Sequence, residues 1–246
     1  MQLKVLDTGS ASAEQNMLLD SELLESLGSE PVLHFYEWEK ESISHGYFIV
    51  PGKFLDLNQV AMQDIDLARR PTGGGVVFHL WDFAFSVLIP SSSPHFSLNT
   101  LDNYDFINQA VLQAVQEFLG RGEKLELISQ DAGAWDLSCH SFCMAKPTKY
   151  DLVLEGRKIA GAAQRKRKQG FLHQGTIALV MPPEERLRGL LLPEGKVADA
   201  ILAHTYPLLG NHASTLQIEE AKRQLRELLQ KSLTQNMENV LNFPVT

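Results

Sequence analysis

Cysteine is scarce in this sequence, long apolar runs are missing, and basic residues are outnumbered by acidic ones. Only two cysteines, Cys139 and Cys143, occur among the 246 residues. That number excludes a disulfide framework and predicts a cytoplasmic protein, because small secreted folds rely on several cystines. No apolar run approaches the roughly 18 residues of a membrane-spanning helix, and the first residues lack the charged-then-apolar pattern of a signal peptide. We therefore expect no membrane partner.

The charge balance argues against another large class of partners. Lys and Arg total 22 while Asp and Glu total 30, which gives a formal net charge of −8 and an isoelectric point near 5.5. A protein with a general affinity for nucleic acid carries the opposite sign. Nucleic acid is therefore not an expected partner.

The order of the local patterns predicts an α+β protein. The length fits one large domain, so we expect a single catalytic domain over residues 1–246, with a helical tail from about residue 181. Helices are expected after capping boxes at Ser12 and Ser214 and over residues 104–118. Strands are expected at residues 31–36, 47–50, 76–78, 83–89, 125–128, 150–154, 158–163 and 177–180. This order does not repeat βαβ units, which favours α+β over α/β.

Three consecutive glycines, Gly73 to Gly75, form the first segment that could carry chemistry. They follow Arg69 and Arg70 and precede a short strand. Glycines are kept where φ must be positive or where something approaches the backbone closely. Their amides could cradle a carboxylate, carbonyl or phosphate beside an arginine, although a tight turn explains them equally well. The spacing fits neither a nucleotide P-loop nor a dinucleotide fold.

Residues 156–164 (GRKIAGAAQ) predict a strand with small side chains on one face. Small residues leave room for a ligand whose polar end Lys158 could hold; the alternative is an exposed lysine on a closely packed strand. A basic run, residues 165–168 (RKRK), follows at once, so residues 157–168 hold six basic side chains and no acidic one. Such a run can steer an acidic partner, or it can be a solvated loop.

Cys143 is the candidate nucleophile. A nucleophilic cysteine needs its thiolate stabilised by nearby cations. The cationic candidates are Lys146, Lys149 and Lys158. A small buried apolar role is the alternative for a single cysteine. Cys139 and His140 leave two further interpretations open, a redox pair of cysteines and a zinc site that lacks a fourth ligand.

Three other polar residues could meet a substrate. His173 lies beside a glycine in residues 172–176 (LHQGT), and His79 and Asp82 follow the strand after the glycines. Each could instead be a satisfied structural residue.

Taken together, these segments resemble one known family. Residues 69–79 (RRPTGGGVVFH) resemble the Arg-Arg-x-Ser/Thr-Gly-Gly signature of the lipoate-protein ligase and octanoyltransferase family. Residues 150–164 look like its lysine-bearing segment, residues 172–177 are similar to its closing His-x-Gly-Ser/Thr stretch, and residues 36–38 and 46–48 match its opening strands. The resemblance runs from about residue 3 to residue 180.

The resemblance implies a mixed, mostly antiparallel sheet flanked by helices, as in the catalytic domains of biotin and lipoate protein ligases. It also implies that the glycine loop and the Lys158 strand embrace an eight-carbon acyl chain, with Lys158 at its carbonyl or carboxyl group. The substrate-binding residues implied in this way are Arg70, Thr72, Gly73, Gly74, Gly75, His79, Gly161, Ala162, Gln164, His173, Gly175 and Thr176. No metal site is expected.

Two branches of the family differ in mechanism. Ligases activate free lipoate with ATP and Mg and need no cysteine, whereas the cysteine branch of octanoyltransferases uses an enzyme thioester and no cofactor. Residues 143–152 (CMAKPTKYDL) fit the Cys-x-x-x-Pro-x-x-Tyr-x-Leu pattern of that branch. The sequence departs from this branch in three places. Residues 80–82 (LWD) replace an Asp and a Gly-Asn turn, and residues 144–145 (MA) replace Phe-Asp. The third departure is Gly75, because a third glycine is commoner in the ligases.

The resemblance therefore implies an octanoyl or lipoyl transferase that acts on a protein lysine, with Cys143 and Lys158 as catalytic residues. The implied partners are lipoyl-domain proteins, such as the E2 component of a 2-oxoacid dehydrogenase or the glycine-cleavage H protein, and acyl carrier protein as a donor. The alternatives are an ATP-dependent lipoate-protein ligase and a catalytically silent paralogue that only binds acyl groups or lipoyl domains. Biotin ligase fits less well, because its basic glycine loop differs.

Overall fold

The computed structural model describes residues 2–120, 122, 124–129, 137–145, 148–193 and 196–241. Its helices are Ala13–Glu25 (α1), Leu57–Met62 (α2), Thr100–Leu119 (α3), Glu184–Leu190 (α4), Val197–His204 (α5) and Thr215–Leu241 (α6). The strands are Lys4–Ala11 (β1), Val32–Trp38 (β2), Ser42–His45 (β3), Asp66–Arg69 (β4), Val76–His79 (β5), Asp82–Pro90 (β6), Leu125–Leu127 (β7), Leu152–Leu154 (β8), Arg157–Arg167 (β9) and Gly170–Ala178 (β10). Short 3₁₀ turns lie at Pro51–Lys53 and Leu137–Ser141.

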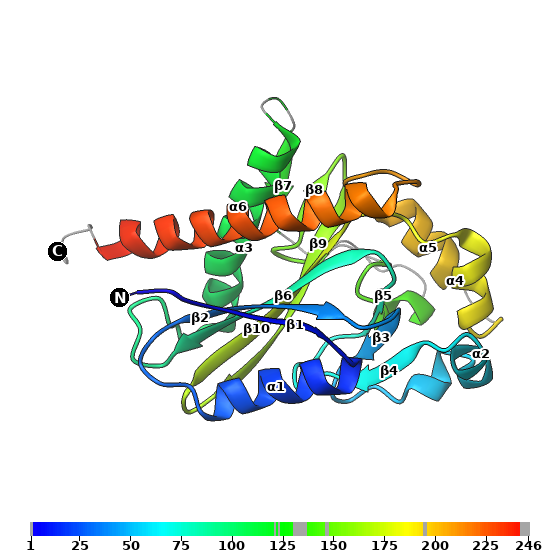
Figure 1. The fold of residues 1–246 in the computed structure, drawn as a ribbon, viewed down its shortest axis with the longest axis horizontal. Helices are drawn as coiled ribbons and strands as arrows, with labels where there is room; N and C mark the ends of the chain where they lie inside the picture. The colour runs from blue at the N-terminus through cyan, green and yellow to red at the C-terminus, as the bar shows by residue number, and fades with distance from the viewer. Residues whose placement is uncertain are drawn as a thin grey trace.

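Two sheets form the framework of the molecule. The larger has seven strands in the order β1-β2-β6-β10-β9-β8-β7, and the smaller has three in the order β4-β3-β5. The pairs β1–β2 and β3–β4 are parallel, and every other pair is antiparallel. The small sheet lies at one end of the large one (Figure 1). The expected α+β class and mostly antiparallel sheet are confirmed.

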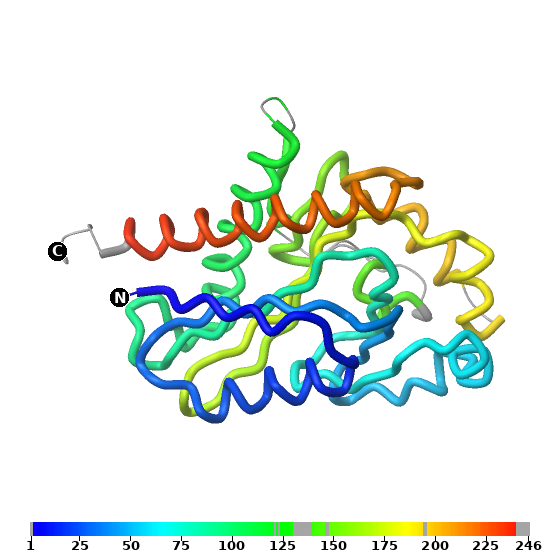
Figure 2. The backbone as a smooth tube through the Cα atoms, in the orientation of Figure 1, coloured from blue at the N-terminus to red at the C-terminus, as the bar shows by residue number. Residues whose placement is uncertain are grey.

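Helices cover both faces of the large sheet. Alternate side chains of β6, such as Phe83 and Phe85, join α3 and α6 in the main apolar core, as the two-residue period of a strand requires. The intervening side chains face α1, where Ala84 packs with Met17. Figure 2 shows α1 and α6 on opposite sides of the strands. The strands beneath α1 carry the polar groups described below.

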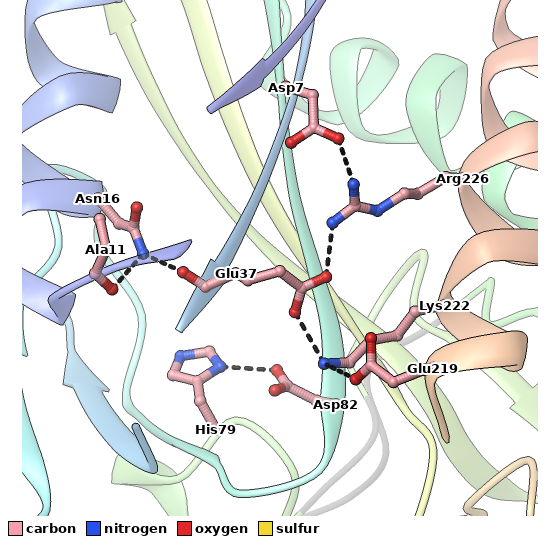
Figure 3. A network of polar contacts seen from close by, with 9 residues as sticks. All are labelled: Asp7, Ala11, Asn16, Glu37, His79, Asp82, Glu219, Lys222 and Arg226. Atoms are coloured by element: carbon pink, nitrogen blue, oxygen red, sulfur yellow. Dashed lines mark hydrogen bonds and ion pairs between the residues drawn. The ribbon is translucent and has the colours of Figure 1, made fainter. Parts of the chain in front are cut away.

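Ion pairs fasten α6 to the first strands (Figure 3). Glu37 at the end of β2 accepts from Lys222 at 2.7 Å and also pairs with Arg226, which contacts Asp7 of β1. Apolar residues recur at helical spacing along α6 and pack against the main core, with Leu228 only partly buried; they are Ile218, Ala221, Leu225, Leu228 and Leu229. These contacts attach the last helix directly to the central sheet.

Most sequence-predicted elements are present, and the differences have local causes. Ser12 accepts from the Gln15 amide and the Gln15 side chain accepts from the Ser12 amide, so the predicted capping box is confirmed. The corresponding contacts of Ser214 confirm the second box. The strand expected at residues 47–50 is wrong: the strand is β3, and Phe48 is 88% exposed. The Tyr47 amide instead donates to the Thr72 carbonyl at 2.9 Å, because this segment turns against the glycine loop.

No helix in the described ranges is long and apolar enough to cross a membrane.

Candidate functional site

A pocket lies between the small sheet and the α1-facing side of the large sheet. Residues 161–163 of β9 and 174–176 of β10 line one part of it. The remaining lining residues are Met17, Tyr36, Trp38, Ser44, Arg70, Val77, His79 and Cys143. Predicted site residues from the glycine segment, the cysteine segment and both closing strands therefore meet in one place.

Arg70 holds the glycine loop from inside the protein. The residue is 5% exposed, and its guanidinium donates to the carbonyls of Gly73 at 3.1 Å and Gly75 at 2.7 Å, and to Ser44 Oγ at 2.8 Å. Burial lowers the pKa of Arg70, and the neighbouring Cys143 acts in the opposite direction. Because arginine is not deprotonated in proteins, the side chain stays cationic. Arg70 thus places a buried positive charge beside the cysteine.

The glycines give the Cys143 segment close access to the backbone. Gly74 has a φ of +84°, and a Cβ on it would lie 3.5 Å from Cys143 Sγ. A Cβ on Gly75 would lie 2.2 Å from the Ser141 carbonyl oxygen, closer than atoms can approach. The Gly75 amide donates to Cys143 Sγ at 3.2 Å. The loop is therefore built to bring an N–H group and a cation to the sulfur.

Thr72 ties the same loop to the sheet beneath α1. Its hydroxyl donates to Gln174 Oε1 at 2.7 Å, and Gln174 Nε2 donates to the buried Asp20 at 2.6 Å. Asp20 also accepts from Ser86 and pairs with His34 Nδ1 at 2.8 Å. This chain of bonds sets the position of the loop over β10.

Lys158 is buried, which corrects the alternative of an exposed surface lysine. It is 2% exposed, its Nζ lies 2.6 Å from Asp151 Oδ2, and it donates to the Cys143 carbonyl oxygen at 2.8 Å. The register between β8 and β9 shifts here, because Val153 pairs with Lys158 whereas Leu152 pairs with Ala160. Side chains at this end of β9 therefore do not alternate regularly between the two faces of the sheet. A Cβ on Gly161 would lie 2.4 Å from Lys158 Cε, so this glycine makes room for the lysine.

His79 and Asp82 form a polar line into the pocket. His79 Nδ1 lies 2.6 Å from Asp82 Oδ2, and its Nε2 lies 2.6 Å from Ser44 Oγ (the first contact is drawn in Figure 3). Thr176 also donates to Asp82. The Trp38 ring covers His79 with centroids 4.2 Å apart.

Two predicted site residues lie on the other face of the sheet. Gln164 and His173 are directly paired across β9 and β10, and Gln164 Nε2 lies 2.8 Å from His173 Nδ1. His173 packs beside Phe85 and Tyr104 under α3, is fully buried, and has its pKa lowered to about 3 by desolvation. Its Nε2 has no partner among the described residues. Gly175 lines the pocket, and a Cβ on it would clash with the Phe85 ring.

The basic run belongs to the end of β9 and its turn. Arg165 donates to the Pro71 carbonyl at 2.7 Å and lies over the Tyr47 ring, while Lys166 donates to the Leu98 carbonyl at 2.7 Å. Arg167 and Lys168 are exposed. Part of the run thus supports the glycine loop, and part of it faces solvent.

Neither Cys139 nor Cys143 forms a disulfide, and Cys139 is buried among apolar residues. Lys146 and Pro147, which belong to the predicted cysteine motif, lie outside the described residues. No group of three or more His, Cys, Asp or Glu side chains that could hold a metal occurs in the part of the chain that the structure describes.

Sequence reasoning missed Ser44, Asp20 and Asp151. Ser44 belongs to no motif of the sequence and lies in a short strand, and Asp20 lies on the helix expected after Ser12, which carried no predicted site residue. Asp151 lies inside the cysteine motif of residues 143–152, at a position to which that motif assigns no residue type. The only signal in the sequence was that each acid directly adjoins an apolar residue, Leu19 for Asp20 and Leu152 for Asp151; a charge that becomes buried needs a partner.

The two sheets, with a glycine loop folded over their junction, define a catalytic domain of the lipoate ligase type. The chain belongs to the family of lipoyl protein ligase A/B catalytic domains, whose family model matches residues 12–230. The resemblance found in the sequence is thereby confirmed.

Relatives and solved structures agree with this family. The octanoyltransferase LipM of Lysinibacillus sphaericus is 35% identical over 187 residues, covering 74% of this chain and 67% of that protein. The octanoyltransferase LipM of Geobacillus kaustophilus is 32% identical over 239 residues, covering 94% of this chain and 86% of that protein. A bipartite lipoate protein ligase from Thermoplasma acidophilum, studied with its E2 lipoyl domain, superposes with a TM-score of 0.68 at 23% identity over 98% of this chain and 92% of that one. This last likeness concerns the fold.

Proposed function

We propose that this protein transfers an octanoyl group to a lysine of a lipoyl-domain protein through a thioester on Cys143. The observation that carries the proposal is the surroundings of Cys143 Sγ, which accepts from the Gly75 amide at 3.2 Å beside the buried Arg70 guanidinium. Both groups favour negative charge on the sulfur, and a thiolate is the attacking form of cysteine. The relatives named octanoyltransferase support this chemistry.

In the proposed first step, the Cys143 thiolate attacks the carbonyl carbon of an acyl thioester. The donor leaves as a thiolate and takes up from water the proton that Cys143 gave up on ionising, and the acyl group stays on Cys143. In the second step the uncharged amine of the acceptor lysine attacks this thioester, and Cys143 is released as the amide forms. Dividing one exchange into two steps is what covalent catalysis supplies. This route needs neither ATP nor a metal.

Arg70 and Lys158 have different tasks in this proposal. Arg70 lines the pocket, so its charge can stabilise the oxyanion that develops at the acyl carbonyl. Lys158 binds the backbone carbonyl of Cys143 and is itself neutralised by Asp151. We therefore assign Lys158 first to positioning the nucleophile, in addition to the carbonyl contact expected from the sequence.

An apolar cavity adjoins the pocket and could receive the acyl tail. It shares Val77 and Thr176 with the pocket and extends toward Ala178, Met181 and Ile201. Binding there removes the apolar surface of an alkyl chain from water, and each methylene buried in this way stabilises the complex by about 0.8 kcal/mol. Leu187 of α4 and Ile201 of α5 line this cavity. We therefore propose that the helical tail and the sheets act as one domain.

The second candidate is an ATP-dependent lipoate-protein ligase. The triple glycine and the fold shared with the Thermoplasma ligase favour it. A ligase would couple lipoate to the lysine through an adenylate, so its activity would need ATP and Mg but not Cys143.

A paired assay on a lipoyl domain separates the candidates. With octanoyl acyl carrier protein as donor, the wild type should add an octanoyl group, and Cys143→Ala should lose this activity by at least about 10³-fold. Cys139→Ala is the matched control and should keep it. A Cys143→Ala chain that still modifies the domain, with ATP and lipoate as substrates, would establish the ligase. A chain inactive in both arms would be the silent paralogue.

A further inference from the structure

Ser44, His79 and Asp82 are arranged as a serine nucleophile with its base and orienting acid. The Ser44 Oγ to His79 Nε2 distance and the His79 Nδ1 to Asp82 Oδ2 distance are both 2.6 Å. Serine hydrolases on unrelated folds are recognised by this geometry and not by the order of the residues in the chain. Ser44 comes from β3, His79 from the end of β5 and Asp82 from the start of β6.

The hydrogen-bond partners favour one assignment of the protons. Arg70 can only donate, so Ser44 Oγ accepts from it at 2.8 Å and its own hydroxyl proton is free to point at His79 Nε2. The Asp82 carboxylate accepts from Thr176 and can accept from His79 Nδ1–H. This is the ground state of a serine triad, in which the ring nitrogen facing the hydroxyl is unprotonated.

The surroundings of the triad suit acyl chemistry. Ser44 lines the same pocket as Cys143, and the buried Arg70 guanidinium adjoins both side chains. Ser44, His79 and Asp82 are 0%, 6% and 9% exposed, and Trp38 covers the imidazole. A buried cation at Oγ stabilises the charge that develops on an attacked carbonyl or on the departing alkoxide.

We propose that Ser44 is a second acyl-accepting nucleophile, which takes a medium-chain acyl group from a thioester in this pocket and releases it to water. Ser44 Oγ attacks the thioester carbonyl carbon while its proton passes to His79 Nε2, and the thiol leaves with that proton. Water then attacks the Ser44 ester and gives a proton to His79. The carboxylic acid is released, and His79 returns the proton to Ser44 Oγ, which regenerates the hydroxyl. The net reaction is thioester plus water to carboxylic acid plus thiol. The inference rests on the proposed function only for the identity of the acyl group.

The test uses the full chain carrying Cys143→Ala, so that the cysteine cannot react. An octyl fluorophosphonate, which modifies activated serine hydroxyls, should label Ser44, as located by peptide mass spectrometry. The same chain should hydrolyse 4-nitrophenyl octanoate, and adding Ser44→Ala or His79→Gln should lower that rate by about 10²–10³-fold. Asp82→Asn should also slow it and Asp82→Glu should restore part of it.

Ser42→Ala is the matched control. Ser42 is equally buried on β3, directly opposite His79 in the sheet, but its hydroxyl donates to the Lys40 carbonyl at 2.8 Å. It should leave labelling and hydrolysis unchanged. The proposal is overturned if Ser44 in the folded Cys143→Ala chain remains unlabelled, or if ester hydrolysis is the same with and without Ser44. Neither result depends on whether Cys143 carries the octanoyl transfer, which the lipoyl-domain assay measures separately.

Discussion

Lys158 shows how a single buried charge joins stability to the active site. Its ammonium group is shared between Asp151 and the Cys143 carbonyl, and it is almost fully buried. We expect Lys158→Ala to lower the free energy of unfolding by about 3–5 kcal/mol, because the Asp151 charge would remain buried without its partner. Urea denaturation measures this loss. An exposed lysine, the alternative that the sequence left open, would cost almost nothing on removal.

A matched pair of variants separates folding from function at this position. Lys166→Ala removes an exposed lysine from the same strand and should cost little stability. Replacing both partners, as Lys158→Met with Asp151→Leu, should recover much of the stability, since an apolar pair of similar size is often tolerated. It should not recover acyl transfer. An unchanged urea midpoint for Lys158→Ala would refute the structural role.

His173 should make stability depend on pH. Burial lowers its folded pKa to about 3, whereas an unfolded histidine titrates near 6.5. Between these values the unfolded chain binds a proton that the folded chain does not. Stability is therefore complete above about pH 6.5 and falls as the pH drops toward 3, by up to about 1.4 kcal/mol per pH unit. Urea denaturation at pH 7 and pH 5 should show a smaller difference for His173→Gln, whereas the exposed His212→Gln should keep the wild-type slope.

The meeting of distant residues in one pocket was predictable from the sequence only where a motif names them. The motif placed Arg70, Gly74 and Cys143 in one site, and they do lie together. Ser44 gave no signal, because its importance comes from His79 on another strand. The burial of Lys158 depends on a bulge and on Gly161. Such features arise from pairing between strands, which the composition of one segment does not reveal.

At the scale of the element, the β9–β10 hairpin carries a charge prediction. Arg165 holds the glycine loop through Pro71, so reversing its charge would disturb the pocket itself. Arg167 and Lys168 are exposed instead and are the better probes. We expect Arg167→Glu with Lys168→Glu to raise the Michaelis constant for an acidic protein substrate and to weaken its dependence on salt. Turnover at saturating substrate should stay unchanged, since these residues act at long range.

The control for the hairpin is a pair with the same change in net charge. Lys4→Glu with Lys124→Glu reverses two exposed charges at the outer edges of the large sheet. If both double variants have the same Michaelis constant and the same salt dependence as the wild type, the exposed end of the basic run plays no part in attracting the substrate.

Elements with a strong local pattern were the ones predicted correctly. The helices α1, α3 and α6 have apolar residues at helical spacing and capping residues at their starts. The segment at residues 47–50 has the aromatic and β-branched composition of a strand, but the Tyr47 amide donates to the Thr72 carbonyl and the Ile49 amide to the Gly46 carbonyl. Composition predicts an extended chain there and cannot supply the neighbouring strand that a sheet needs.

At the scale of the whole molecule, α6 depends on Glu37 for its polar attachment. Glu37 is about a quarter exposed and meets both Lys222 and Arg226. We expect Glu37→Ala to lower the free energy of unfolding by about 1 kcal/mol, and by less at high salt, because partly exposed pairs are screened. Urea denaturation at two salt concentrations measures both effects. Glu219→Ala, at a more exposed partner of Lys222, should have almost no effect; equal losses for the two variants would contradict this account.

The arrangement of the large sheet also determines when the protein can begin to work as it is synthesised. Strand β6 pairs with β2, which precedes it in the chain, and with β10, which follows much later. The Thr72–Gln174 bond joins residues 102 positions apart. A ribosome adds about 5–20 residues per second, so the glycine loop waits several seconds for the strand on which it rests. The apolar side of the sheet waits longer, until α6 follows. Full pairing of the large sheet and burial of its apolar side therefore come only late in translation.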